Sequence, residues 1–156
     1  VVKDLNGLSP ESFIEAVRKA GFSVECKGKE QVAPAKKGTF GMYLAGNWYL
    51  LTAGEALRSA HPVAGLDVSI LQDYLLSPIL NIEDPRTDGR IDFVGGIRGL
   101  DELERRVAHD MEIAFSMYAT SIEELLSVAD AELLMPPKST WFEPKLRSGL
   151  FIHRLS

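Results

Sequence analysis

Two apolar runs separated by a turn constrain the fold of this chain more than any other feature. They make up residues 38–53, GTFGMYLAGNWYLLTA, and are rich in residues that favour strands. Between them stands Gly46-Asn47, a pair that tolerates positive φ and is typical of two-residue hairpin turns. We therefore predict a hairpin over residues 39–53.

Helical patterns stand on both sides of this hairpin. In LSPESFIEAVRKAG, Ser9 suits the N-cap, Pro10 the first helical position and Gly21 the position past the end. We predict three further helices: one that starts with Asp67 as its N-cap, one over 100–110, and one over 120–130 with a capping box of Thr120 and Glu123.

Short alternating segments predict four more strands. They are 22–27, a strand of about five residues beginning at Arg90 with Ile91 and Phe93 on one face, 111–119, and the final stretch 149–155. Hairpins mixed with helices in a chain of this size predict an α+β fold with a mixed or mostly antiparallel sheet. We interpret residues 1–156 as a single α+β domain, since neither a linker nor a repeat interrupts them.

Composition excludes several classes of protein and partner. The 156 residues are 46% apolar and 25% charged, which is typical of one packed domain and not of disorder or a disulfide scaffold. The net charge of -5 is modest and both signs are interspersed, so we expect no nucleic-acid partner and no membrane partner. The lone Cys26 agrees with a reducing compartment, and we expect a cytoplasmic protein.

A glycine-rich turn is the first candidate site. In DFVGGIRGLDEL a predicted strand runs through Gly95, Gly96 and Gly99 into a helix, whose first amides are suited to an anion. Arg98 adds a cation of planar, forked geometry. The other interpretation is that the glycines only permit a tight turn, since the spacing is that of neither known phosphate-binding fingerprint.

The stretch MPPKSTWFEPKLRSGL, residues 135–150, is the second candidate site. Pro136 and Pro137 stiffen the backbone, and Lys138, Ser139 and Thr140 then offer an ammonium, two hydroxyls and amides to a phosphate or carboxylate. The alternative is structural: the prolines end the preceding helix, while Trp141 and Phe142 plug the core. The residues alone leave both interpretations open.

The remaining polar candidates have simpler explanations, and we expect no metal site. The histidines lack the spacing of metal ligands: His61, His109 and His153. Turn chemistry explains Asp84 and Asp88 better than magnesium binding, and an N-cap role explains Asp67.

Three stretches, GLDVSILQDYLLSPIL, RIDFVGG and MPPKSTWFEPKLRSGLFIHRL, together resemble the C-terminal region of the prokaryotic family called domain of unknown function 1015. The likeness covers essentially the whole chain, and the block from Pro136 to Trp141, followed by Pro144-Lys145-Leu146, is the most distinctive motif of the family. Members are more than twice this size, and the chain begins without Met, so we expect an N-terminal region of the same protein as a partner.

The resemblance implies a link to serine metabolism, in some members as a kinase for free serine. We expect phosphoryl transfer to a small hydroxy substrate, with Mg²⁺ and a nucleotide or pyrophosphate donor. The catalytic candidates are Lys138, Ser139 and Asp92, with Asp67 as a second candidate base unless the base lies in the N-terminal region. The candidates for binding a small anionic or phosphorylated ligand are Gly95, Gly96, Arg98, Lys138, Ser139 and Thr140.

This hypothesis makes a geometric prediction: Lys138, Ser139 and Thr140 should lie on a stiff loop that is anchored by Trp141 and Phe142 and faces Gly95-Gly96. The alternative is a domain without catalytic activity, which either senses a small ligand or docks onto the N-terminal region.

Overall fold

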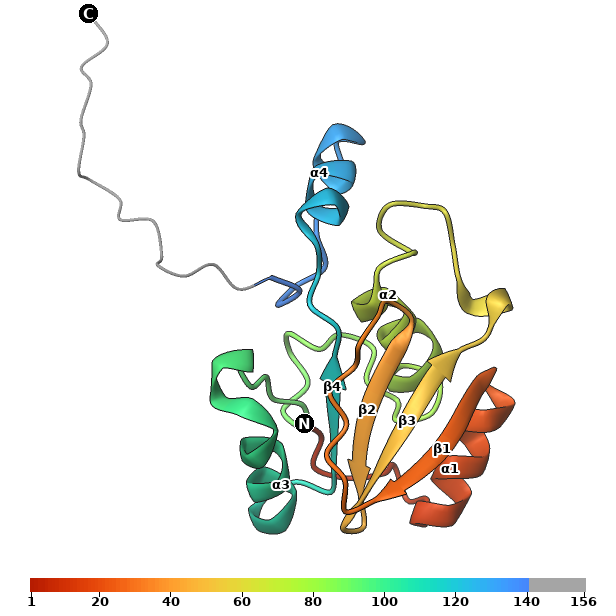
Figure 1. Ribbon diagram of the computed structural model, residues 1–156, viewed down its shortest axis with the longest axis vertical. Helices are drawn as coiled ribbons and strands as arrows, with labels where there is room; N and C mark the ends of the chain where they lie inside the picture. The colour runs from red at the N-terminus through yellow and green to blue at the C-terminus, as the bar shows by residue number, and fades with distance from the viewer. Residues whose placement is uncertain (141–156) are drawn as a thin grey trace, which may run out of the picture.

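The computed structural model describes residues 1–140 of the chain (Figure 1). Its elements, in order, are α1 (Pro10–Lys19), β1 (Phe22–Gly28), β2 (Thr39–Leu44), β3 (Asn47–Ala53), the short turn η1 (Glu55–Leu57), α2 (Asp67–Leu71), the π-helical turn η2 (Gln72–Leu76), the 3-10 turn η3 (Gly96–Arg98), α3 (Gly99–His109), β4 (Ile113–Met117) and α4 (Ile122–Asp130).

The four strands form one antiparallel sheet in the order β1-β3-β2-β4. This sheet, together with its helices, confirms the α+β prediction. The predicted hairpin is also present, but its turn lies one residue earlier, because Ala45 and Gly46 have positive φ of 48° and 72°. Asn47 instead begins β3 and pairs with Leu44.

Helices cover both faces of the sheet. One face carries the larger core, in which Phe13 of α1 and Ile70 of α2 pack with Phe40 of β2. On the other face, the fully buried Trp48 of β3 packs in a smaller cluster that includes Leu103 of α3. Figure 1 shows α1 and α3 on opposite sides of the strands.

The predicted helix ends are correct for α1 and wrong for α2. Ser9 caps α1 through its hydroxyl, Pro10 is the first helical residue, and Gly21 has the predicted positive φ of 103°. Asp67, in contrast, is not the N-cap of α2, because Leu66 holds that position and the Asp67 carboxylate binds the backbone N–H of Gly38. A partner distant in sequence thus replaces the local capping role.

The predicted strand at Arg90 is wrong. Ile91 makes only an isolated bridge to Val2, and the side chain of Phe93 is 42% exposed. Val2 also bridges to Ile113, so the N-terminal segment lies between Ile91 and β4. This segment prevents residues 90–94 from joining the edge of the sheet.

α4 has a capping box, but one residue later than predicted. Ser121 and Glu124 form the reciprocal pair, whereas the Thr120 hydroxyl donates to the carbonyl of Ser139 at 3.1 Å. Figure 1 shows α4 projecting beyond the end of β4, away from the layered part of the domain. The predicted strand 149–155 and the predicted anchors Trp141 and Phe142 lie outside the described residues.

Candidate functional site

The predicted anion loop around Lys138 is tied to the start of α4. Lys138 is exposed and has a positive φ of 60°. The Ser139 hydroxyl donates to the carbonyl of Pro136 at 2.5 Å. The backbone carbonyl of Ser139 accepts a hydrogen bond from the Thr120 hydroxyl. The hydroxyl of Ser139 is thus used to hold the loop, while the Lys138 side chain and the neighbouring Thr140 are exposed.

The glycine turn has a conformational explanation at Gly99. Gly99 has a positive φ of 73°, which favours glycine, whereas a Cβ added at Gly96 would meet no atom within 4 Å. The Arg98 guanidinium lies 3.6 Å from Glu102, and its side chain is 68% exposed. Within residues 1–140 no hydrogen bond or ion pair joins this turn to Lys138, Ser139 or Thr140, so the predicted facing of the two loops remains a prediction.

Asp92 is engaged by Arg106. The Arg106 guanidinium donates to its carboxylate at 2.8 Å, and the backbone N–H of Phe93 donates to the other oxygen at 2.8 Å. These two bonds lower the pKa of Asp92, with the bond from Arg106 as the larger cause. A carboxylate held in this way is a weaker base than an ordinary aspartate.

Three loops meet at one end of the sheet, where β2 begins and where β3 and β4 end (Figure 1). A hollow of about 320 Å³ lies among them, and we call it the sheet-end hollow. Its lining is polar and comes from the segment before β2, the loop after β3, and the first turns of α4: Lys37, Ser59, Ala60, His61, Pro62, Gly65, Glu123, Glu124 and Ser127.

Positively and negatively charged side chains both line the sheet-end hollow. The Lys37 ammonium lies 2.5 Å from the Glu124 carboxylate, which also completes the capping box of α4. The Nδ1 atom of His61 accepts from the backbone N–H groups of Val63 and Ala64 at 3.2 and 3.3 Å. The neutral ring therefore carries its proton on Nε2, which is then the nitrogen able to donate to a ligand.

A buried carboxylate supports one wall of the hollow. Asp67 is 8% exposed and accepts from the backbone N–H of Gly38 at 2.9 and 3.1 Å. Burial is the main influence on this carboxyl and raises its pKa, while the bond from Gly38 and the charge of Lys37 act in the opposite direction. A raised carboxyl pKa beside a polar hollow is typical of a functional site.

Comparison with known families adds an assignment for part of the chain. Residues 1–69 match the family described as Protein of unknown function (DUF1015). No curated protein and no solved structure matches the chain.

The DUF1015 segment contains much of the sheet-end hollow. Lys37, His61 and Asp67 all lie within residues 1–69, whereas Glu124 and the loop of Lys138 lie beyond the matched residues. The sequence favoured a cap for Asp67 and named it only as a second candidate base, it found no metal-ligand spacing at His61, and it gave no signal for Lys37. No motif spacing in the sequence predicts that Lys37 and His61 lie near Glu124, because these residues come from loops that are far apart in the chain.

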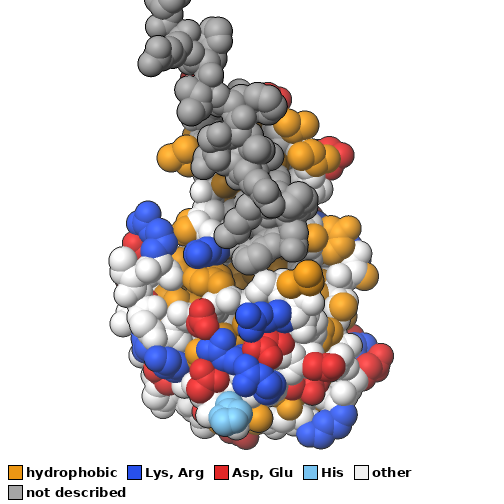
Figure 2. All heavy atoms as spheres, turned by 90° about the vertical axis from the view of Figure 1, so that its left-hand side faces the viewer, with side chains coloured by type: hydrophobic (Ala, Val, Ile, Leu, Met, Phe, Trp, Pro, Cys, Tyr) orange, Lys and Arg blue, Asp and Glu red, His pale blue; other side chains and the backbone are white. Residues whose placement is uncertain are grey.

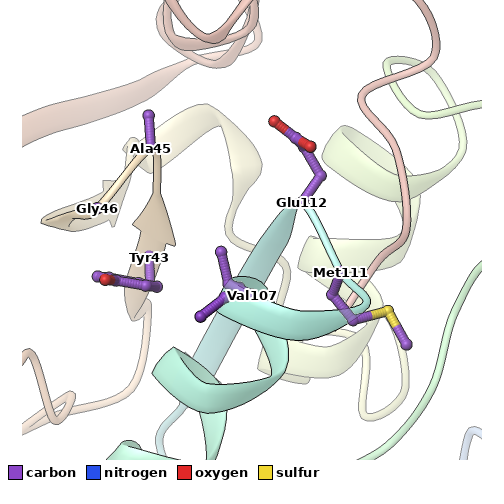
Figure 3. Close-up of a pocket in the computed structure, with 7 residues that line it drawn as sticks. Tyr43, Ala45, Gly46, Val107, Met111 and Glu112 are labelled. Atoms are coloured by element: carbon purple, nitrogen blue, oxygen red, sulfur yellow. The ribbon is translucent and has the colours of Figure 1, made fainter.

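A second hollow lies at the opposite end of the sheet. It has a volume of about 290 Å³, and Figure 3 shows it between the β2-β3 turn and the end of α3, around Tyr43, Val107 and Met111. Glu112 is the one charged residue among its lining residues. With so few polar groups converging on it, this hollow is a weaker candidate than the sheet-end hollow.

Several surface charges on the face that carries α3 are paired. Figure 2 shows acidic and basic side chains interspersed on the face that carries α3. There, Arg105 pairs with Glu102 at 2.7 Å, and Arg106 pairs with Asp92 and with Asp110. Within residues 1–140 no group of three potential ligands is arranged to hold a metal ion, and no helix is both long and apolar enough to cross a membrane.

Proposed function

We propose that this DUF1015 chain is the anion-binding part of a cytoplasmic phosphotransferase that acts on a small hydroxy substrate such as free serine. The observation that supports this proposal is that Lys37 and His61 line the sheet-end hollow, while the buried Asp67 carboxylate binds Gly38, the residue next to Lys37. The loop of Lys138 is tied to the start of the helix that forms another wall of this hollow.

These residues suit phosphoryl transfer, which depends mainly on positioning and on stabilising charge. Lys37 and Lys138 supply positive charge to a phosphate, while the Nε2–H of His61 supplies a hydrogen-bond donor. The raised pKa of Asp67 favours it over Asp92 as the proton acceptor for the substrate hydroxyl. The described residues offer no ligand set for Mg²⁺, so no step of this proposal passes through the metal.

An assay of phosphoserine formation tests the proposal. We would supply the full-length protein with serine and, in turn, ATP, ADP or pyrophosphate, and detect phosphoserine by mass spectrometry. We expect Lys37→Ala and Lys138→Ala each to lower the rate at least tenfold, since each removes a charge from the phosphate. Lys19→Ala is the matched control, because Lys19 is exposed on α1 and lies outside the sheet-end hollow.

Failure with every donor would end the phosphotransferase proposal. Binding of phosphate or pyrophosphate without turnover, lost in Lys37→Ala, would instead support a ligand-sensing domain. The two roles are thus distinguished by titrating the same variants with inorganic phosphate and following the amide resonances of Gly38 and Ser59.

A docking role is the second candidate, and the exposed apolar side chains of α4 and of the segment after it favour it. Ile122 is 57% exposed, Leu126 53% and Leu134 89%. Such a cluster is typical of an interaction surface, here for the N-terminal region of the same protein. If this role is correct, Leu126→Glu should weaken association between separately expressed parts of the full-length protein, whereas Ser127→Glu should change it less.

A further inference from the structure

The ion pair of Lys37 and Glu124 joins two walls of the sheet-end hollow. Lys37 precedes β2, Glu124 lies in the first turn of α4, and both residues line the hollow. The Glu124 side chain is only 20% exposed, compared with 51% for Lys37. Burial alone would raise the pKa of Glu124, but the hydrogen bonds from Lys37 and from the Ser121 backbone lower that pKa. Glu124 is therefore a charged carboxylate near neutral pH.

This carboxylate occupies the group that an anionic ligand would need. Among the residues that line the sheet-end hollow, Lys37 is the one lysine or arginine, whereas Glu123 and Glu124 are both acidic. An anion that enters the hollow meets repulsion from both carboxylates and must compete with Glu124 for the ammonium of Lys37. The hollow as it stands in this structure is thus closed to anions by its own charge.

The same ion pair is the polar link between α4 and the layered part of the domain. Across residues 1–140, it is the one ion pair or hydrogen bond that joins α4 to residues 1–117. Val128 is the buried residue of α4, and it belongs to neither core cluster. Figure 1 shows α4 projecting beyond the end of β4. Loss of this ion pair should therefore free α4 to move.

We propose that Glu124 makes an autoinhibitory contact: it holds the ammonium of Lys37 until a phosphate or a phosphorylated ligand displaces it. This inference rests on the proposed anion-binding role of Lys37. Binding exchanges one anionic partner of Lys37 for another, so it is weaker than binding to a free ammonium. Because the displaced carboxylate also ties α4 to the domain, anion binding and the position of α4 are coupled in both directions.

Titration of the full-length protein with inorganic phosphate, followed by the amide resonances of Gly38 and Ser59, tests this proposal. Glu124→Gln keeps an acceptor for the Ser121 N–H but loses the charge, so we expect phosphate to bind about fivefold more tightly than to wild type. Glu123→Gln is the matched comparison, because it removes the same charge from the same turn without breaking the ion pair. It should tighten binding by less than about twofold.

Lys37→Ala breaks the same ion pair from its other side and should abolish the phosphate-induced shifts. If the pair only held the structure together, Glu124→Gln and Lys37→Ala would both weaken binding, and that result would overturn the proposal. Equal tightening by Glu123→Gln and Glu124→Gln would show a general effect of charge and would also overturn it. The amide of Leu51 in the interior strand β3 reports whether each variant remains folded.

The coupling to α4 has its own measurement. Phosphate bound to wild type should move the amide resonance of Val128 towards its position in ligand-free Glu124→Gln, and an unmoved resonance would overturn the coupling. Unchanged affinity in Glu124→Gln, with phosphate still bound by wild type, would overturn the autoinhibitory contact alone and leave the anion-binding proposal in place. The absence of phosphate-induced shifts in wild type and in Glu124→Gln would contradict both proposals.

Discussion

The carboxylate of Asp67 accepts a hydrogen bond from the backbone N–H of Gly38, 29 residues earlier in the chain. The nitrogen lies 2.9 and 3.1 Å from the two carboxylate oxygens. This contact joins the segment that precedes β2 to the start of α2. Both residues are buried, so water cannot replace either partner without an opening of the fold. Asp67 therefore has a structural role whether or not it also takes part in chemistry.

We expect Asp67→Ala to lower the free energy of unfolding by about 1–3 kcal/mol, because it leaves the N–H of Gly38 buried without a partner. Asp67→Asn retains an acceptor oxygen and should cost less. Urea unfolding followed by circular dichroism measures both changes. Asp73→Ala is the control at an exposed aspartate and should stay within about 0.5 kcal/mol of wild type.

The raised pKa of Asp67 also predicts a pH dependence. Its folded-state pKa lies above the ordinary value of 3.8, so the folded chain binds this proton more tightly than the unfolded chain. The resulting stabilisation is complete below the unfolded pKa and is lost as pH rises through the folded pKa. The stability of wild type relative to Asp67→Asn should therefore fall as pH rises from the unfolded pKa of Asp67 to its folded pKa. A stability difference that does not change with pH would contradict the raised pKa of Asp67.

Gly41 in β2 leaves no room for a side chain. A Cβ there would overlap the Ser116 hydroxyl and the carbonyl of Val32, which are themselves joined by a hydrogen bond of 2.7 Å. We expect Gly41→Ala to lower the free energy of unfolding by about 1–3 kcal/mol, as overpacking usually does. Gly89→Ala is the control, because no atom lies within 4 Å of its added Cβ, and equal costs in urea would refute the steric argument.

The buried indole of Trp48 depends on one acceptor in α3. Its Nε1–H donates to the Glu104 carboxylate at 2.7 Å, and the side chain is fully buried. Glu104→Ala should therefore destabilise the fold by about 1–3 kcal/mol, since the indole N–H loses its partner. Glu104→Gln keeps an acceptor and should recover part of this loss in thermal or urea unfolding. No difference between the two variants would show that the hydrogen bond contributes little.

The pKa of Asp92 should depend on Arg106. The hydrogen bond from the Arg106 guanidinium is the largest cause of the lowered pKa of Asp92. Arg106→Gln should therefore raise this pKa towards the ordinary range. Carbon NMR titration of the side-chain carboxyl gives this value directly. Arg105→Gln serves as the control, because Arg105 binds Glu102 instead, and it should leave Asp92 close to its wild-type pKa.

Local signals predicted some elements correctly. Ser9, Pro10 and Gly21 fixed the limits of α1, because a cap and a positive φ act within a few residues of the helix end. The alternation of apolar residues predicted β4, although the sequence extended it beyond its observed end at Met117. These predictions needed no knowledge of the rest of the chain.

Predictions failed where a distant partner competed with a local one. Asp67 binds Gly38 instead of capping α2, and Thr120 binds Ser139 instead of capping α4. For the candidate site, the loop of Lys138 stays a prediction, and the sequence gave no sign that Lys37 would lie beside Glu124. Such meetings depend on how distant segments pack and not on local preference.

The sequence by itself determined the class of fold, the hairpin and the limits of α1, since caps, turns and alternating apolar residues are local properties of the chain. Only the tertiary structure decided the strand order, the sheet-end hollow and the position of the N-terminal segment beside β4. The physical reason is that these features arise from long-range contacts. Val2 beside Ile113 and Gly38 beside Asp67 are examples, and their partners are set by packing of the whole domain.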